Sequence, residues 1–414
     1  MPVSSAIHSV RERARHLGVA TITLAIRSYR RMLRRTTFIA VTGSGGKTTA
    51  KELIYTIASS QGAGTKTKGT FNGLSAMARA ILRTRPWHRF CVMEMGVGRK
   101  GNMERYVSMT RPDIGIMLAI GLDHYTAFRS REAVAEEKGH IVRCLPRHGT
   151  AILNADDPLI AAQAEHTRAR VVRIGCSEDV DLRATDVSSV WPDRLSFTLH
   201  MDGKAYRIQS RLLGTQWVVS LLAALAVGRS LHIPTEDMMR AIESFEPVQG
   251  RMTPVTHSDG VTFICDDWKT PYWSLDYAVS FLREARASRR ILVIGTISDT
   301  PGSTAPKYRR LAKDALAFAD LVIFVGKNSH YSSKPNETPH PKLKQFATVR
   351  EASEFLDGKL VAGDLVLIKG SMAADHLIRI PLHRERAIAC WRMDCQRMTR
   401  CTDCPLLYRQ APDA

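Results

Sequence analysis

The residues whose types and spacing best suit chemistry form a glycine-rich loop near the start of the chain. Residues 41–49 read Val-Thr-Gly-Ser-Gly-Gly-Lys-Thr-Thr, between a predicted apolar strand and a predicted helix. Glycines let backbone amides approach phosphate oxygens, and the following helix presents its positive end to the anion. Lys47 can neutralise the outer phosphates, and the Thr48 hydroxyl can ligate Mg²⁺. The strict Walker A pattern has glycine where Val41 stands, but the rest of the segment predicts a nucleotide-phosphate site. The residues expected to bind the phosphates are Thr42, Gly43, Ser44, Gly45, Gly46, Lys47, Thr48 and Thr49.

A second chemical signal is a cluster of thiols close to the C-terminus. The cysteines follow the spacing C-x4-C-x5-C-x2-C: Cys390, Cys395, Cys401 and Cys404. Four thiolates in so short a segment suit tetrahedral Zn²⁺, and the last pair has the spacing of a zinc knuckle. We therefore predict a structural zinc site. An iron–sulfur cluster, which the proline after Cys404 would fit, and reduced thiols without a metal are the alternatives.

The elements that must position these groups alternate between strands and helices. Apolar strands are predicted at residues 38–41, 90–95, 114–120 and 150–153, with helices such as 51–60 and 133–144 between them. Segment 180–212 predicts antiparallel strands, segment 216–245 predicts helical structure, and segment 327–341 predicts an exposed loop. A second series of strands is predicted at residues 261–265, 290–294, 321–325 and 365–368. Such alternation indicates mostly parallel sheets with helices on both faces.

The fold class is therefore α/β. We expect a P-loop central domain with a mostly parallel sheet and a Rossmann-like C-terminal domain. A basic helical segment precedes them and a short cysteine-rich tail follows. The expected bounds are 1–35 for the basic segment, 36–247 for the central ATP-binding domain, 248–382 for the C-terminal domain and 383–414 for the tail.

Composition narrows the classes of partner. The chain is 44% hydrophobic and 24% charged, which excludes a disordered or fibrous protein. Its net charge of +19 points to an anionic substrate or an anionic surface. Residues 1–35 hold eight arginines and one glutamate and predict a helix packed on the body of the protein. The alternatives are a helix that contacts an anionic membrane and an arm that holds an anionic substrate. We find neither a long apolar stretch nor a signal peptide and expect a cytoplasmic protein.

Further motifs resemble those of the Mur ligase family, most closely its UDP-N-acetylmuramoyl-tripeptide–D-alanyl-D-alanine ligase branch. Thr42–Glu52 (TGSGGKTTAKE) is similar to the ATP loop of that branch, and residues 70–72 (TFN) resemble its substrate-side loop. The other motifs occur in the family's order, at residues 93–96 (MEMG), 111–113 (RPD), 121–124 (GLDH), 137–138 (EK), 153–157 (LNADD), 250–252 (GRM), 266–267 (DD) and 369–371 (KGS). The resemblance covers roughly residues 36–380.

The resemblance implies an ATP-dependent ligase. In such a reaction ATP phosphorylates a substrate carboxylate, an amine attacks the acyl phosphate, and phosphate leaves. The resemblance further implies that Thr48 and Glu94 hold a first Mg²⁺, while His124 and Lys138 serve a second one. In this family the lysine that matches Lys138 is carbamylated, which turns it into a suitable oxygen ligand. The implied catalytic residues are Lys47, His124 and Lys138, and the implied cofactors are ATP and Mg²⁺.

The C-terminal motifs imply further site residues. Arg251 and Asp267 resemble family residues that reach the nucleotide when the domains close and exclude water. An interdomain ion pair is the alternative for both. Asn72, Lys369 and Ser371 are expected on the substrate side.

The chain departs from the family pattern in three places. About 35 residues precede the phosphate loop, too few for the domain that grips the UDP-sugar. Trp217 lies in the segment where the family has an asparagine that contacts adenine, so it either stacks on the base or belongs to the core. Residues 266–272 (DDWKTPY) replace the family's Asp-Asp-x-Tyr-Asn-Ala-x-Pro, which indicates a different donor or acceptor, or a packing difference.

The leading hypothesis is thus an ATP-dependent carboxylate–amine ligase whose substrate is not the standard UDP-N-acetylmuramoyl-peptide. The expected partners are a small carboxylate and a small amine, anionic in character. One alternative is a ligase that modifies a lipid-linked peptidoglycan precursor, with residues 1–35 docked on the membrane. The other is a nucleotide-dependent protein that binds nucleic acid or a partner protein without catalysis. The presence of both Glu94 and His124 argues against it, and nucleic acid is not an expected partner.

Overall fold

The computed structural model describes residues 23–123, 125–335, 338–393, 395, 397 and 399–409. Most of the expected basic segment, residues 1–22, therefore lies outside the described residues, as does His124. The chain divides into two units. The first comprises Met1–Thr185, Thr198–Ile208 and Val218–Phe245, and the second comprises Asp186–Phe197, Gln209–Trp217 and Glu246–Ala414.

A nine-stranded sheet forms the centre of the first unit. Its order is β2-β3-β1-β4-β5-β6-β7-β8-β9. The strands are β1 (Thr37–Thr42), β2 (Gly64–Lys66), β3 (Phe90–Glu94), β4 (Ile114–Met117), β5 (Thr150–Asn154), β6 (Arg170–Gly175), β7 (Leu182–Ser188), β8 (Ser196–Met201) and β9 (Lys204–Gln209). The pairs from β2 through β7 are parallel. A two-residue turn with positive φ at Asp202 and Gly203 joins β8 to β9, so that pair is an antiparallel hairpin.

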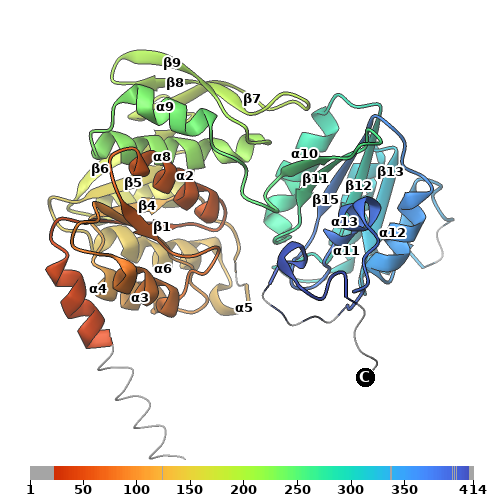
Figure 1. Ribbon diagram of the computed structural model, residues 1–414, viewed down its shortest axis with the longest axis horizontal. Helices are drawn as coiled ribbons and strands as arrows, with labels where there is room; N and C mark the ends of the chain where they lie inside the picture. Colours follow the sequence, from red (N-terminus) through yellow and green to blue (C-terminus); the bar gives the residue numbers. More distant parts are fainter. Residues whose placement is uncertain are drawn as a thin grey trace, which may run out of the picture. The chain divides into compact units, whose positions relative to one another are not determined.

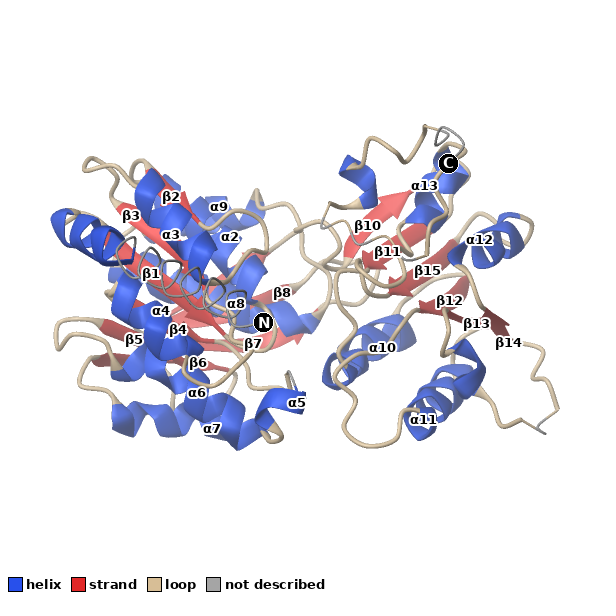
Figure 2. Cartoon of the chain, turned by 90° about the horizontal axis from the view of Figure 1, so that it is seen from below, coloured by secondary structure: helices blue, strands red, loops and turns tan. Residues whose placement is uncertain are grey.

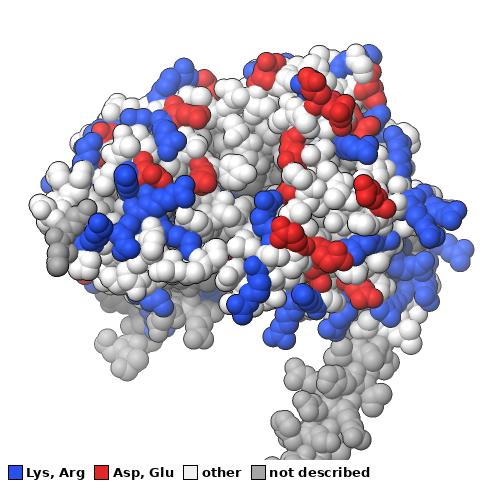
Figure 3. All heavy atoms as spheres, turned by 180° about the vertical axis from the view of Figure 1, so that it is seen from behind, with Lys and Arg blue, Asp and Glu red and all other residues white. Residues whose placement is uncertain are grey.

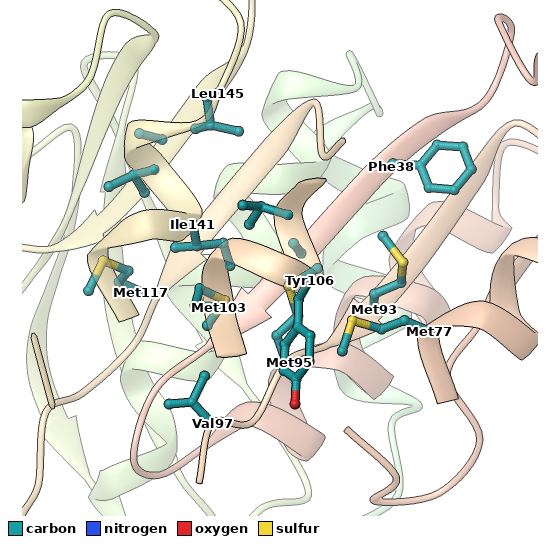
Figure 4. Packing of buried hydrophobic residues seen from close by; sticks show 14 of the residues in the cluster. Phe38, Met77, Met93, Met95, Val97, Met103, Tyr106, Met117, Ile141 and Leu145 are labelled. Carbon is teal, nitrogen blue, oxygen red and sulfur yellow. The ribbon is translucent and has the colours of Figure 1, made fainter. Parts of the chain in front are cut away.

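Helices cover both faces of this sheet. They are α2 (Lys47–Ser59), α3 (Leu74–Arg83), α4 (Asn102–Thr110), α5 (Tyr125–Phe128), α6 (Arg131–Arg143), α7 (Pro158–Ala161), α8 (Val218–Ser230) and α9 (Thr235–Glu243). Figure 1 shows α2, α8 and α9 on one face and α3, α4 and α6 on the other. Both faces of β1, β3 and β4 are consequently buried, which explains their continuous apolar sequences. Figure 4 shows part of the resulting core, where Met77, Met93, Met95 and Met103 pack near Phe38 and Tyr106.

A six-stranded sheet forms the second unit. Its order is β10-β11-β15-β12-β13-β14, parallel except for the antiparallel pair of β10 and β11. The strands are β10 (Thr253–Thr256), β11 (Thr262–Asp266), β12 (Arg289–Ile294), β13 (Leu321–Val325), β14 (Leu343–Phe346) and β15 (Asp364–Lys369). The helices are α10 (Leu275–Glu284), α11 (Ala305–Leu316), α12 (Val349–Asp357) and α13 (Arg379–Glu385). Because right-handed crossovers reverse direction after β14, α10 and α11 cover one face and α12 the other, as Figure 2 shows.

The described part of the basic segment is a helix packed on the first unit. Residues 23–32 are helical, and Ile26 is buried in the same apolar cluster as Phe38. The guanidinium of Arg30 is also buried; it lies 3.2 Å from Asp113 and 3.6 Å from the centre of the Phe38 ring. These contacts confirm the packed-helix interpretation for residues 23–32. Within the described residues, no helix has the length and apolar character needed to cross a bilayer. On the face drawn in Figure 3, basic side chains are interspersed with acidic ones.

The helical structure expected at residues 216–245 is confirmed as two helices, α8 and α9, preceded by the 3₁₀ turn η2 (Thr215–Trp217). Pro234 lies at the start of α9, and a proline cannot continue a preceding helix because it lacks the backbone N–H. The loop expected at 327–341 contains the 3₁₀ turn η4 (Ser329–Ser332), with two buried serines, and is not wholly exposed.

Candidate nucleotide and metal site

The glycine-rich loop joins the end of β1 to the start of α2. The chain leaves β1 toward β2 on one side and later returns to β4 on the other, so the loop lies at a switch point of the sheet. Gly43 and Gly46 have φ of 152° and 77°, and a side chain on Gly46 would meet the Ser220 hydroxyl at 2.8 Å. Glycine is therefore required at both positions. Lys47 donates from Nζ to the Gly43 carbonyl at 2.7 Å, which holds its charge against the loop.

The two residues predicted to hold the first Mg²⁺ are in direct contact. Glu94 ends β3, is 2% exposed, and accepts a hydrogen bond from the Thr48 hydroxyl at 2.9 Å. It also accepts one from the Asn72 amide at 3.1 Å. Asn72 lies so close to Gly96 that any side chain there would clash with it. The structure thus brings together Thr48, Glu94 and Asn72, which the sequence placed in three separate motifs.

Lys51 is a site residue that the sequence interpretation missed. It is fully buried on α2, with Nζ 3.1 Å from Glu52 and 3.8 Å from Glu94, and it donates to the Gly69 carbonyl. A buried ammonium group needs such partners, because isolated charges are very costly inside a protein. Its position within the TGSGGKTTAKE motif was a signal, but helical spacing alone gave no reason to separate it from surface lysines.

Lys138 lies at the same loop, although it belongs to α6. Its side chain is almost fully buried; Nζ donates to the Gly43 carbonyl at 3.3 Å and lies 3.6 Å from a carboxylate oxygen of Asp123. The neighbouring Glu137 points elsewhere and caps α4 by accepting from the Gly101 and Met103 amides, both at 2.8 Å. The two residues of one motif therefore have different roles, one at the loop and one in the scaffold.

The loop that follows β4 is held by the motif at residues 153–157. The Asn154 amide donates to the Leu118 carbonyl at 2.8 Å, and Asp157 accepts from the Ile120 amide at 3.0 Å. Asp157 also pairs with Arg131 at 3.3 Å. These side chains hold the segment that leads to Asp123, whose carboxylate lies beside the Lys138 amino group.

Trp217 is a core residue in this structure. Its side chain is buried, and its indole N–H donates to the Leu213 carbonyl at 2.8 Å. Since the polar edge of the ring is satisfied within the protein, the core alternative for this residue is confirmed.

In the second unit, residues at and just after the carboxyl ends of β11 and β15 form a polar cluster. Lys369 pairs with Asp266 at 2.6 Å and donates to the Lys269 carbonyl at 3.1 Å. The Ser371 amide donates to Asp375 at 2.9 Å. Burial raises the pKa of Asp375, an effect that the hydrogen bonds it accepts oppose. Lys369 and Ser371 thus lie at the carboxyl end of β15, where open α/β sheets bind ligands.

The other C-terminal site residues gather at the end of β11. Asp267 is buried next to Trp268, and the guanidinium of Arg251 lies 5.8 Å from the centre of the Trp268 ring. Burial raises the pKa of Asp267, while Arg400 and Arg251 act in the opposite direction. The structure therefore brings Arg251 and Asp267 together within the second unit.

The tail cysteines surround one small cavity next to α13, lined by all four thiols together with His376 and Arg379. The buried Arg379 donates from Nε to Cys401 Sγ at 3.3 Å, and His376 Nδ1 lies 3.5 Å from the same sulfur. Burial and the nearby Arg379 lower the pKa of His376 to about 4. Among the described residues, no group of three or more His, Cys, Asp or Glu side chains is arranged to hold a metal ion. The four cysteines thus line the same cavity, and the binding of zinc by them stays a prediction.

A phosphate loop at the switch point of a mostly parallel sheet, followed by a second α/β unit, defines a nucleotide-binding protein of the P-loop class. The chain matches the Mur ligase middle domain over residues 41–228 and the Mur ligase, glutamate ligase domain over residues 250–372.

Named relatives agree with these matches. The UDP-N-acetylmuramoyl-tripeptide–D-alanyl-D-alanine ligase of Mycobacterium leprae is 32% identical over 366 residues, which cover 81% of this chain and 71% of the relative. The enzyme of the same name from Mycobacterium tuberculosis is 28% identical, covering 82% and 71%. The solved MurF ligase from Thermotoga maritima in complex with ADP shares the fold, with a TM-score of 0.79 at 20% identity over 89% of this chain and 84% of that chain.

The chain belongs to the Mur ligase family. The family resemblance and the α/β fold class expected from the sequence are confirmed. Members of this family are ATP-dependent ligases that form amide bonds and use ATP with Mg²⁺, and this protein is such an enzyme.

Proposed function

We propose that this protein joins a carboxylate to an amine through an acyl phosphate, on a substrate other than the standard UDP-N-acetylmuramoyl-tripeptide. One observation carries the chemistry: the buried Lys138 amino group and the Thr48–Glu94 pair both adjoin the glycine-rich loop. Lys138 Nζ donates to the Gly43 carbonyl at 3.3 Å, and Thr48 donates to Glu94 at 2.9 Å. A phosphoryl-transfer site needs oxygen ligands and cations arranged in this way around the phosphates.

Each residue has a role in the reaction. The loop amides and Lys47 bind the phosphates of ATP, so that the carboxylate oxygen of the substrate attacks the γ-phosphorus and ADP leaves. The amine nitrogen then attacks the acyl carbon, the carbon–oxygen bond to phosphate breaks, and the nitrogen loses a proton as inorganic phosphate departs. Thr48 and Glu94 are the residues that would hold the first Mg²⁺, which when bound neutralises charge on the phosphates.

Lys138 would act as a carbamate, as the matching lysine does in the family. Its neutral amine adds to CO₂ and releases one proton, which gives a carboxylate-like group. The Asp123 carboxylate lies 3.6 Å from Nζ and offers an oxygen ligand beside it. His124, the other residue that the resemblance implies for the second Mg²⁺, lies outside the described residues.

The segment at residues 266–272 supports a substrate that differs from the standard one of the family. Residues 269–271 read Lys-Thr-Pro where the family has Tyr-Asn-Ala, and the aromatic residues Trp268 and Tyr272 lie on either side. Here the Lys269 carbonyl accepts from Lys369, and the Tyr272 ring lies 5.5 Å from the Lys307 ammonium. An added cation near the end of β15 favours an anionic acid or amine substrate.

The test is a mixed screen of carboxylic acids and amines with ATP and Mg²⁺, read by mass spectrometry for an amide product. Phosphate release should require both substrates, and Lys47→Ala should abolish it. Exposed Lys68→Ala, on the loop after β2, is the matched control and should keep full activity. Release of phosphate by Lys47→Ala at the rate of the unmodified enzyme would overturn the proposal.

A further inference from the structure

The carboxylate of Asp267 is buried without a hydrogen-bond donor from the described part of the chain. Asp267 follows β11 and is 1% exposed, and neither of its carboxylate oxygens accepts a hydrogen bond from a described residue. An ionised carboxylate in such a place is very costly unless a cation compensates it. The cation closest in the described structure is Arg400, whose Nη2 lies 3.5 Å from Asp267 Oδ1.

Arg400 comes from the cysteine-rich tail, directly before the 3₁₀ turn η5 (Cys401–Asp403). Its side chain is 10% exposed, and its guanidinium lies 5.6 Å from the centre of the Trp268 ring. Two of its nitrogens, Nε and Nη1, are buried without an acceptor among the described residues. Arg400 therefore retains two N–H groups that can donate to a polar ligand, and Asp267 retains two carboxylate oxygens that can accept from one.

The residue opposite the pair is a glycine for a physical reason. A Cβ atom on Gly250 would lie 2.6 Å from Arg400 Nη1 and 2.9 Å from Asp267 Oδ1, and its φ is 72°. Any other residue at this position would displace the guanidinium or the carboxylate. Gly250 begins the motif that contains Arg251, so the tail arginine packs against the same segment that the family resemblance assigns to the nucleotide.

The tail holds Arg400 through its own packing on the second unit. Leu407 and Cys401 are buried in the core cluster of that unit. Leu407 also accepts from the Ala389 amide at 2.8 Å, which closes the tail into a loop. Arg379 adds a hydrogen bond from Nη1 to the Arg392 carbonyl at 2.7 Å. The residues that follow Arg400 are thus held by the core of the second unit.

We propose that Arg400 is a positioning residue for Asp267, supplied by a tail that lies outside the matched family domains. It compensates the charge of the carboxylate and orients it for the nucleotide. The inference rests on the proposed ATP-dependent function and on the family resemblance, which implies that Asp267 reaches the nucleotide. It predicts that removal of Arg400 affects ATP use and that the tail is required for full activity.

The kinetic test compares Arg400→Gln, Arg400→Lys and the exposed tail arginine Arg409→Ala as a matched control. Loss of one partner of a buried charge pair should lower kcat/KM for ATP by about tenfold or more. KM for ATP should carry most of that change, Arg400→Lys should recover part of it, and Arg409→Ala should match the unmodified enzyme. A fall in Tm with unchanged kcat/KM for ATP in Arg400→Gln would overturn the proposal.

A second measurement does not depend on ligase activity. Arg400→Gln, Asp267→Asn and the double variant are compared by thermal unfolding. If the two groups form a pair, Asp267→Asn should restore part of the Tm that Arg400→Gln loses, because the unpaired carboxylate is gone. Strictly additive losses would refute the pair, whether or not the unmodified protein catalyses ligation.

Discussion

Replacement of Lys51 by methionine should strongly destabilise the first unit, although Lys51 touches no predicted substrate. The ammonium group is fully buried, with Glu52 at 3.1 Å, Glu94 at 3.8 Å and the Gly69 carbonyl as partners. Removal of one partner of a buried ion pair costs about 3–5 kcal/mol. Here Glu52 keeps Lys66 as a second partner, and Glu94 keeps the Thr48 and Asn72 hydrogen bonds.

These remaining partners place the expected loss near the lower limit, at about 3 kcal/mol. At about 2–4 °C per kcal/mol for a unit of this size, Tm should fall by roughly 6–12 °C. The assay is differential scanning calorimetry of the full chain, with the exposed Lys68→Met as control. Addition of Glu94→Gln to Lys51→Met should restore part of the loss. A Tm of Lys51→Met equal to that of Lys68→Met would refute the reasoning.

Four further predictions follow from the same structure. Lys138→Ala should abolish amide formation but keep nucleotide binding within about a few-fold, since the phosphates are held by the loop; loss of all nucleotide binding in calorimetric titration would contradict the separate role. Trp217→Ala should lower stability by about 3–5 kcal/mol, as expected for a core residue, and leave KM for ATP unchanged; a selective rise in that KM would indicate base stacking. Arg400→Gln should lose stability more steeply than the unmodified protein as pH rises above about 4, because burial already raises the pKa of Asp267 and loss of the Arg400 charge raises it further, so that the unfolded chain binds fewer protons; Asp267→Asn added to it should remove this extra slope, and a slope that persists in Tm measurements would contradict the assignment. The intact chain should contain about one zinc per molecule by elemental analysis, and a variant truncated after residue 385 none; an intact chain without metal would refute the predicted zinc site.

The sequence was most informative where one local pattern determines one local structure. The order of residues 42–49 specifies a tight turn between a strand and a helix, and the structure has that turn, with positive φ at Gly43 and Gly46. The apolar strands around it were also found, because strands buried on both faces have continuous apolar sequences. The weakly apolar strands β6 and β14 were missed, since each combines polar and apolar residues without a clear period.

The site was predicted only in part because its remaining contacts are non-local. The ion pairs of Lys51 and Lys138 with carboxylates depend on where α2 and α6 lie against the loop, and no spacing along the chain encodes this. The Arg400–Asp267 pair joins residues that are more than one hundred positions apart, in the tail and after β11. Such partners can be identified only when the order of the strands in the sheet is known. The order of the motifs along the chain, in contrast, was sufficient to recognise the family.

Isotope transfer from the substrate tests the central claim most directly. An acid identified by the screen is labelled with ¹⁸O in its carboxylate and incubated with enzyme, ATP, Mg²⁺ and the amine. If the carboxylate is activated as an acyl phosphate, one ¹⁸O atom should appear in the inorganic phosphate, because the carbon–oxygen bond breaks when the amine attacks. Amide formation with unlabelled phosphate would contradict the account.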